Sequence, residues 1–333
     1  MSQGAPLLEA IEVRRHFTVG RGILPGSHRR LLAVDGVSLQ VRAGETLGLV
    51  GESGCGKSTL GRCLVRLYQV SGGTIRFQGT DVTRLTARRL RPFRRRMQMV
   101  FQDPYASLNP RRRVGDLIAE PLRVHERLGR REIADRVARV ARRVGLLPDH
   151  LERFPHEFSG GQRQRIGIAR ALVLEPRLIV ADEPVSALDV SIQAQILNLL
   201  ADLQDELGLT YLFIAHDLSV VRQVSERVAV MYLGSIVESG PTEALFATPA
   251  HPYTQALISA VPRPDPRGGR QRIVLAGDVA SPLDPPAGCR FHPRCRYAAA
   301  RCRTDRPALT PIGDDRQVAC HFPLVAPQTP AAG

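Results

Sequence analysis

Lysine is almost absent from this sequence, although the chain is strongly basic. The 333 residues include 46 lysines and arginines against 32 aspartates and glutamates, which gives a net charge of +14, yet Lys57 is the only lysine. Arginine keeps the surface charge when it replaces lysine, so a single remaining lysine indicates a position where a planar guanidinium cannot replace a compact ammonium. Lys57 is therefore a candidate functional residue.

Other absences narrow the class of protein. Tryptophan is missing, aromatic residues make up 5% of the chain, and no apolar run reaches 18 residues. The first two argue against stacking of nucleic-acid bases, and the third argues against a membrane-spanning helix. Glu9 and Glu12 lie where a signal peptide would be apolar, so we expect no secretion. The net charge alone fits nucleic acid, an anionic membrane, a phosphorylated ligand or a solvated arginine surface.

Strand-like and helix-like segments alternate, which predicts an α/β fold with a mainly parallel sheet. Short apolar segments predict strands at 7–14, 45–50, 97–101, 178–181 and 210–215. Helical periodicity predicts helices at 58–67, 131–147 and 190–207. From about residue 249 prolines become frequent and the periodicity fades, so a separate C-terminal extension is expected there.

The lone lysine lies in a glycine-rich segment between a predicted strand and a predicted helix. This segment matches G-x-x-x-x-G-K-[S/T], and its context is that of a P-loop. Glycines let backbone N–H groups turn toward phosphate oxygens, and the helix N-terminus adds positive potential. Lys57 would reach the outer phosphates and Ser58 would bind Mg²⁺. The predicted nucleotide contacts are Gly51, Glu52, Ser53, Gly54, Cys55, Gly56, Lys57, Ser58 and Thr59.

Two acidic residues follow the apolar strand at 178–181. Asp182 has the position of a carboxylate that acts on the bound Mg²⁺. Glu183 comes next and is predicted to orient and polarise an attacking water. A helix-capping acid is the alternative interpretation of Glu183.

Five short segments together resemble the motifs of ATP-binding-cassette (ABC) ATPases. Phe158-Ser-Gly-Gly-Gln-Arg-Gln-Arg is similar to the signature motif that separates this family from other P-loop proteins. Gln102 resembles the Q-loop glutamine, and Asp189 ends a segment that resembles the D-loop. His216 resembles the switch histidine, and Phe17 has the place of the aromatic residue that stacks on adenine.

The resemblance covers about residues 7–250 and implies a P-loop NTPase core. An N-terminal antiparallel β subdomain and an inserted helical subdomain at about 96–165 would complete the cassette. It implies ATP and Mg²⁺ as ligands, Glu183 and His216 as catalytic residues, and a dimer with two ATP molecules between two cassettes. The implied Mg²⁺ ligands are Ser58, Gln102 and Asp182. The residues implied to contact the ATP of the second subunit are Ser159, Gly160, Gly161, Gln162 and Asp189.

A narrower resemblance points to the ATPase subunits of oligopeptide and dipeptide importers. The segments that carry it are 101–110, 155–159 and 251–257, the last of which opens a C-terminal extension at 251–333. An insertion between Val19 and Leu31 resembles the second of the two ATPases in such systems. The resemblance implies a heterodimer with a related ATPase, peripheral on the cytoplasmic face of the cell membrane. This heterodimer would dock on two transmembrane permeases that are fed by a substrate-binding protein.

Other functions remain open from the sequence. Importers of nickel or glutathione use similar ATPases, so the substrate is an inference from the family. A soluble ABC ATPase that acts on nucleic acid would also account for the charge, but the chain has one cassette and no long heptad repeat, and we expect no nucleic-acid partner. An exporter cassette is disfavoured by the importer-like extension.

Four of the six cysteines cluster near the C-terminus. Because we expect no secretion, a disulfide framework is the less favoured interpretation. Four thiolates suit a [4Fe–4S] cluster or Zn²⁺, although the spacing matches neither zinc C-x₂-C pairs nor ferredoxins. Resemblance to importer ATPases that carry an iron–sulfur cluster in this extension favours the cluster, with zinc and unligated thiols left open. The candidate ligands are Cys289, Cys295, Cys302 and Cys320.

Overall fold

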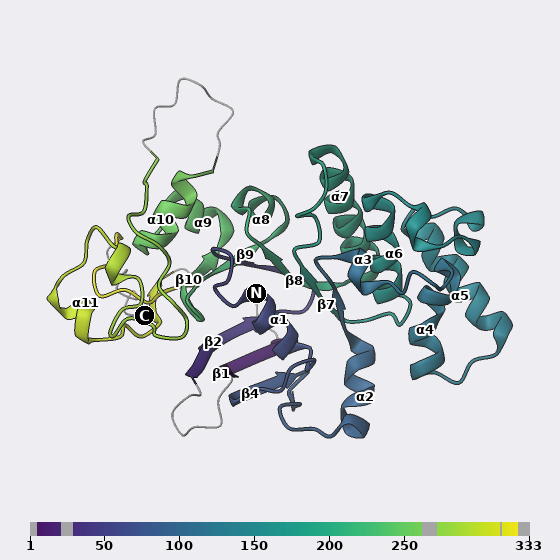
Figure 1. Ribbon diagram of the computed structural model, residues 1–333, viewed down its shortest axis with the longest axis horizontal. Helices are drawn as coiled ribbons and strands as arrows, with labels where there is room; N and C mark the ends of the chain where they lie inside the picture. The colour runs from purple at the N-terminus through teal and green to yellow at the C-terminus, as the bar shows by residue number, and fades with distance from the viewer. Residues whose placement is uncertain (1–4, 21–28, 262–271, 314, 326–333) are drawn as a thin grey trace, which may run out of the picture. The chain divides into compact units, whose positions relative to one another are not determined.

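The computed structural model describes residues 5–20, 29–261, 272–313 and 315–325 (Figure 1). Most of the insertion predicted between Val19 and Leu31 falls on 21–28 and lies outside the described residues. Two compact units alternate along the chain. Unit 1 comprises Met1–Leu8, Val41–Glu45 and Phe77–Ile214, and unit 2 comprises Glu9–Gln40, Thr46–Arg76 and Ala215–Gly333.

Unit 1 contains parallel strands whose apolar runs explain their prediction from sequence. β6 (Met97–Val100) pairs in parallel with β7 (Leu178–Asp182), which pairs in parallel with β8 (Thr210–Ala215). Every residue of β7 and β8 is buried, as expected for strands covered on both faces. α7 (Val190–Leu207) ends at Gly208, whose φ of 63° is the left-handed conformation that stops a helix.

The rest of unit 1 is mainly helical. Its other elements are β5 (Thr80–Asp81), α2 (Ala87–Arg96), α3 (Pro104–Ser107), α4 (Val114–His125), α5 (Arg130–Arg143), η1 (Pro148–Glu152), η2 (Pro155–Glu157) and α6 (Gly160–Leu172). α5 buries Val137 and Val140 as the periodicity predicts, but it ends four residues before the predicted end. Gly145 has a φ of 75°, and this left-handed residue terminates the helix.

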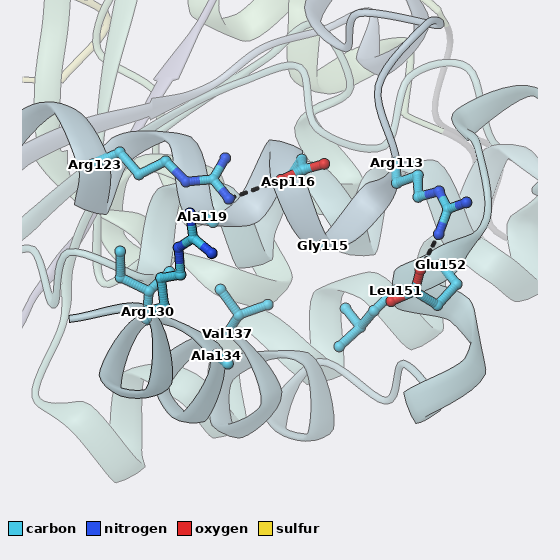
Figure 2. Close-up of a pocket in the computed structure, with 11 residues that line it drawn as sticks. Arg113, Gly115, Asp116, Ala119, Arg123, Arg130, Ala134, Val137, Leu151 and Glu152 are labelled. Carbon is cyan, nitrogen blue, oxygen red and sulfur yellow. Dashed lines mark hydrogen bonds and ion pairs between the residues drawn. The ribbon is translucent and has the colours of Figure 1, made fainter. Parts of the chain in front are cut away.

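α4, α5 and η1 line an open groove of about 790 Å³ (Figure 2). Its walls carry two ion pairs, Arg113 with Glu152 and Arg123 with Asp116, the latter at 2.8 Å between Nη2 and Oδ1. Among the described residues, the predicted nucleotide contacts do not line this groove. The groove is therefore separate from the site that the motifs define.

Unit 2 contains a mixed sheet and an N-terminal antiparallel sheet. β3 (Thr46–Val50) runs parallel to β9 (Arg227–Tyr232), and β9 is antiparallel to β10 (Ser235–Pro241). In the N-terminal sheet, β1 (Leu8–Val19) lies between β2 (Arg29–Val41) and β4 (Gly72–Phe77). The helices of unit 2 are α1 (Lys57–Leu64), α8 (Leu218–Val224), α9 (Thr242–Ala247), α10 (Pro252–Ser259), η3 (His292–Arg294) and α11 (Ala300–Thr304).

The last two strands of the described residues continue the mixed sheet. β12 (Arg316–Val318) pairs antiparallel with β10 and with β11 (Thr310–Gly313). Tyr232, Tyr253 and Phe291 form a buried aromatic cluster, with ring centroids 4.7 to 5.4 Å apart. No helix in the described part of the chain is both long and apolar enough to cross a bilayer. The fold confirms the predicted α/β class with its N-terminal antiparallel sheet.

Candidate functional site

The predicted P-loop connects β3 to α1 in unit 2, and two of its glycines are required by close backbone contacts. Gly51 has a φ of 154°, and a Cβ at this position would lie 2.1 Å from the Met231 carbonyl oxygen. Gly56 has a φ of 105°, and its Cβ would lie 2.1 Å from the Ala33 carbonyl oxygen. Only glycine fits at both positions, and the close contacts there fix the backbone conformation of the loop.

The Lys57 side chain folds back across this loop. The residue is 4% exposed, and Nζ donates hydrogen bonds to the Gly51 carbonyl at 2.7 Å and the Glu52 carbonyl at 3.0 Å. These short contacts suit a compact ammonium, and a wide guanidinium would have to displace the loop. Ser53 and Gly54 are exposed at the tip of the loop, whereas Ser58 and Thr59 are half-buried at the start of α1.

Cys55 is a structural member of the loop. Its side chain is buried, and this burial raises the pKa of the thiol although the Lys57 ammonium acts in the opposite direction. The thiol therefore stays protonated at neutral pH. A protonated, buried thiol is a poor nucleophile and a poor metal ligand.

Unit 1 brings together two of the predicted site residues, Gln102 and Glu183. Gln102 Nε2 donates a hydrogen bond to Glu183 Oε2 at 2.9 Å. Glu183 has a φ of 47°, a strained conformation for a residue with a Cβ, and its N–H donates to the Ile214 carbonyl at 2.9 Å. Asp182 is fully buried at the end of β7. The two neighbouring carboxylates therefore differ in burial, since Asp182 is fully buried and Glu183 is half-buried.

The signature-like segment forms the start of α6 in unit 1. Ser159 caps the helix: its Oγ accepts from the Gln162 N–H at 3.3 Å, and Gln162 Oε1 accepts from the Ser159 N–H at 3.0 Å. A Cβ on Gly161 would lie 2.4 Å from Ile192 Cγ2, so glycine permits close packing there. Asp189 is the exposed N-cap of α7. Gly160 opens the 13-residue helix, whose N-terminus is suited to an anion.

Phe17 and His216 lie in unit 2. The Phe17 ring is half-buried and packs edge-on against Tyr68 at 5.8 Å between centroids, and the Arg15 guanidinium lies 4.5 Å from its centroid. His216 is exposed between β8 and α8. Phe17 therefore presents a partly accessible aromatic ring, as a residue that stacks on adenine must.

Two residues that contact the P-loop were not predicted from the sequence. The Glu52 N–H donates to the Tyr253 hydroxyl at 2.9 Å, and Arg294 donates two hydrogen bonds to the Glu52 carboxylate. Tyr253 and Arg294 are 201 and 242 residues from Glu52 along the chain, so no local pattern connects them to it. The only signal in the sequence for these two residues is that both lie in the C-terminal segment that resembles importer ATPases.

The four clustered cysteines are not arranged around a single metal ion. Within the described ranges, which include all six cysteines, no group of three or more His, Cys, Asp or Glu side chains could hold an ion. This finding argues against the zinc alternative. Burial raises the pKa of the Cys289 and Cys295 thiols and raises that of Cys320 to about 11, while nearby backbone N–H groups lower it in each case.

Comparison with known proteins identifies the class to which this site belongs. The family model described as "ABC transporter" matches residues 34–186, and the model described as "Oligopeptide/dipeptide transporter, C-terminal region" matches residues 237–302. A dimeric ATP-binding cassette, MJ0796, solved in a post-hydrolysis state with ADP and Pi, superposes with a TM-score of 0.63 at 27% identity over 71% of this chain and 98% of that one. The chain is an ABC ATPase with the P-loop NTPase fold.

Relatives narrow the family further. The oligopeptide transport ATP-binding protein AppF of Bacillus subtilis is 52% identical, over 95% of this chain and 97% of that protein. The dipeptide transport ATP-binding protein DppF of Escherichia coli is 49% identical, over 95% and 94%. The chain belongs to the oligopeptide/dipeptide transporter family as an ATP-binding subunit, and it hydrolyses ATP.

Proposed function

We propose that this chain hydrolyses ATP at sites shared with a second cassette and thereby drives the import of oligopeptides or dipeptides through separate permeases. The observation that carries the proposal is the buried Lys57 ammonium, held by the Gly51 and Glu52 carbonyls in a loop that only glycine can form. A buried ammonium beside backbone N–H groups at a helix N-terminus is suited to a polyphosphate.

The first step is the binding of the ATP phosphates by residues 51–59. Phosphate oxygens would replace the carbonyl oxygens that now accept from Lys57 Nζ, and the N–H groups at the start of α1 would complete the cradle. Phe17 would stack on the adenine. The proposed Mg²⁺ ligands, Ser58, Gln102 and Asp182, all offer oxygen atoms, which this ion prefers. Bound Mg²⁺ would neutralise charge on the β- and γ-phosphates.

The second step is the attack of water on the γ-phosphorus. Glu183 accepts a hydrogen bond from this water and orients it, while the Gln102 amide holds the carboxylate at 2.9 Å. The water oxygen forms the new bond to phosphorus, and the bond from phosphorus to the ADP oxygen breaks. We assign to His216 a contact with the γ-phosphate, since an exposed imidazole at a strand end can donate a hydrogen bond to it.

A second cassette would complete each site. Ser159 to Gln162 and Asp189 would face the ATP bound by the partner, with the N-terminus of α6 directed at the γ-phosphate. We propose a related ATPase as this partner, in a heterodimer.

The permeases would contact residues 105–110, which follow Gln102. Tyr105 is 56% exposed, and the Arg163 guanidinium lies 5.6 Å from its ring centroid. Rigid, exposed tyrosines are frequent in protein interfaces. Docking on permeases would place the chain on the cytoplasmic face of the membrane, where its positive charge suits anionic lipids. A substrate-binding protein would act only through the permeases.

An uptake assay tests this function. A strain that lacks the chain should lose uptake of a labelled tripeptide, and the wild-type gene but not the Glu183→Gln variant should restore it. Restoration by Glu183→Gln would contradict coupling of transport to hydrolysis. Loss of nickel or glutathione uptake with normal peptide uptake would instead assign one of those substrates.

We also propose a [4Fe–4S] cluster in the extension. The Cys320 thiol lies close enough to Cys289, Cys295 and Cys302 for their charges to raise its pKa, after the larger effect of burial. Backbone N–H groups of Phe291 and His292 face the Cys289 sulfur, a contact that tunes iron–sulfur clusters. When bound, the cluster would supply a one-electron redox centre.

A further inference from the structure

The Glu52 residue of the P-loop is held by the C-terminal extension. Arg294 Nη1 lies 2.8 Å from Glu52 Oε2, and Arg294 Nη2 lies 3.2 Å from Glu52 Oε1. These two N–H···O bonds form a forked pair, the geometry that fixes orientation as well as distance. The side chains are 9% and 26% exposed, so solvent screens the pair only weakly.

All three polar parts of Glu52 are engaged. Its carboxylate accepts from Arg294, its N–H donates to the Tyr253 hydroxyl at 2.9 Å, and its carbonyl accepts from Lys57 Nζ at 3.0 Å. The first two partners belong to the region after β10, and the third is the predicted phosphate-binding lysine. The position of Glu52 therefore links the extension to the ammonium that would contact ATP.

The supporting residues are themselves firmly packed. Arg294 ends η3, three residues after Phe291, and the Phe291 ring packs against Tyr232 and Tyr253 with centroids 5.3 and 5.4 Å apart. Tyr253 and Phe291 are 0% and 2% exposed. The buried aromatic cluster of Tyr232, Tyr253 and Phe291 therefore fixes the position of the backbone that carries Arg294.

We propose that Arg294 is a positioning residue that sets the P-loop for ATP through its forked ion pair with Glu52. The inference rests on the proposed assignment of residues 51–59 as the ATP site. A partly buried ion pair of this kind adds little net stability, because the desolvation of two charges offsets their attraction. The role of the ion pair is to orient the backbone of Glu52, whose carbonyl accepts a hydrogen bond from Lys57 Nζ.

The test is the ATP dissociation constant of the full-length chain, measured by calorimetry for wild type and variants. Arg294→Gln should weaken ATP binding about tenfold, equivalent to about 1.4 kcal/mol. Arg294→Lys keeps the charge but loses the fork, so its affinity should lie between the two. Arg296→Gln is the matched control, because Arg296 bonds Gln255 and Tyr297 and should leave ATP affinity unchanged.

A double variant separates positioning from general stabilisation. If Arg294 acts through Glu52, Glu52→Gln combined with Arg294→Gln should bind ATP no more weakly than the worse single variant. Additive losses, or wild-type affinity in Arg294→Gln, would overturn the inference. If Arg294→Gln does not fold, the same criterion applies to Arg294→Lys. Lys57→Ala tests the site itself: retained ATP binding in that variant would refute the ATP site, whatever Arg294→Gln does.

Discussion

His251 should make the protein less stable in mild acid. Its side chain is 1% exposed and caps α10, where Nδ1 accepts from the Tyr253 N–H at 3.0 Å. Its surroundings include the Phe291 ring and the buried ion pair of Glu238 with Arg316, and Glu238 accepts from the His251 N–H at 2.8 Å. Burial lowers the pKa of His251 from 6.5 to about 3. The imidazole is therefore neutral in the folded protein at every pH above that value.

The size of the effect follows from proton linkage. Between pH 3 and 6.5 the unfolded chain binds a proton at this histidine that the folded chain does not, so the free energy of unfolding falls as the pH falls. The contribution is fully present above pH 6.5. At about 1.36 kcal/mol per pH unit, lowering the pH to 5 should remove about 2 kcal/mol.

Denaturant unfolding followed by circular dichroism between pH 5 and pH 7.5 measures this loss. His251→Asn keeps an oxygen that can accept the Tyr253 N–H and removes the titration. The free energy of unfolding of the wild type should therefore fall by about 2 kcal/mol more than that of His251→Asn over this range. The remaining titratable groups affect both proteins alike. Parallel pH profiles for the two proteins would refute the assignment of a neutral, buried imidazole.

Three further predictions concern the P-loop and the extension. Lys57→Arg should lower ATP affinity at least about tenfold despite its conserved charge, and unchanged affinity in calorimetry would show that an ammonium is not required. Gly56→Ala should destabilise the protein by about 1–3 kcal/mol because its Cβ would meet the Ala33 carbonyl, whereas an unchanged melting temperature would contradict the loop geometry. Protein purified without oxygen should be brown, with broad absorbance near ~400 nm that Cys302→Ser abolishes; colourless wild type would reject the cluster.

Elements defined by local pattern were predictable from the sequence. β7 and β8 are continuous apolar runs, and they proved to be fully buried parallel strands. α7 spans Val190–Leu207, the range that its helical periodicity predicts. The P-loop was predictable for the same reason. Its glycines, lysine and serine lie within nine consecutive residues, so their spacing in the sequence is enough to predict the loop.

Elements defined by distant contacts were not predictable. β11 and β12 are short and contain proline, glycine and arginine, and they form strands because β10 offers an edge to β12. The same holds for Arg294, which reaches Glu52 across 242 residues. A forked ion pair of this kind leaves no periodicity in the sequence, so only the folded chain reveals it.

The most direct test of the account is ATP hydrolysis by Glu183→Gln. This substitution keeps the size of the side chain and an oxygen that can accept from Gln102, and it removes only the negative charge to which we assign the orientation of the water. Single-turnover hydrolysis and ATP affinity should be measured in parallel, with Glu206→Gln on the surface of α7 as the control. ATP affinity should be unchanged, and hydrolysis should be slower by a factor on the order of 10²–10⁴. Hydrolysis at the wild-type rate would contradict it.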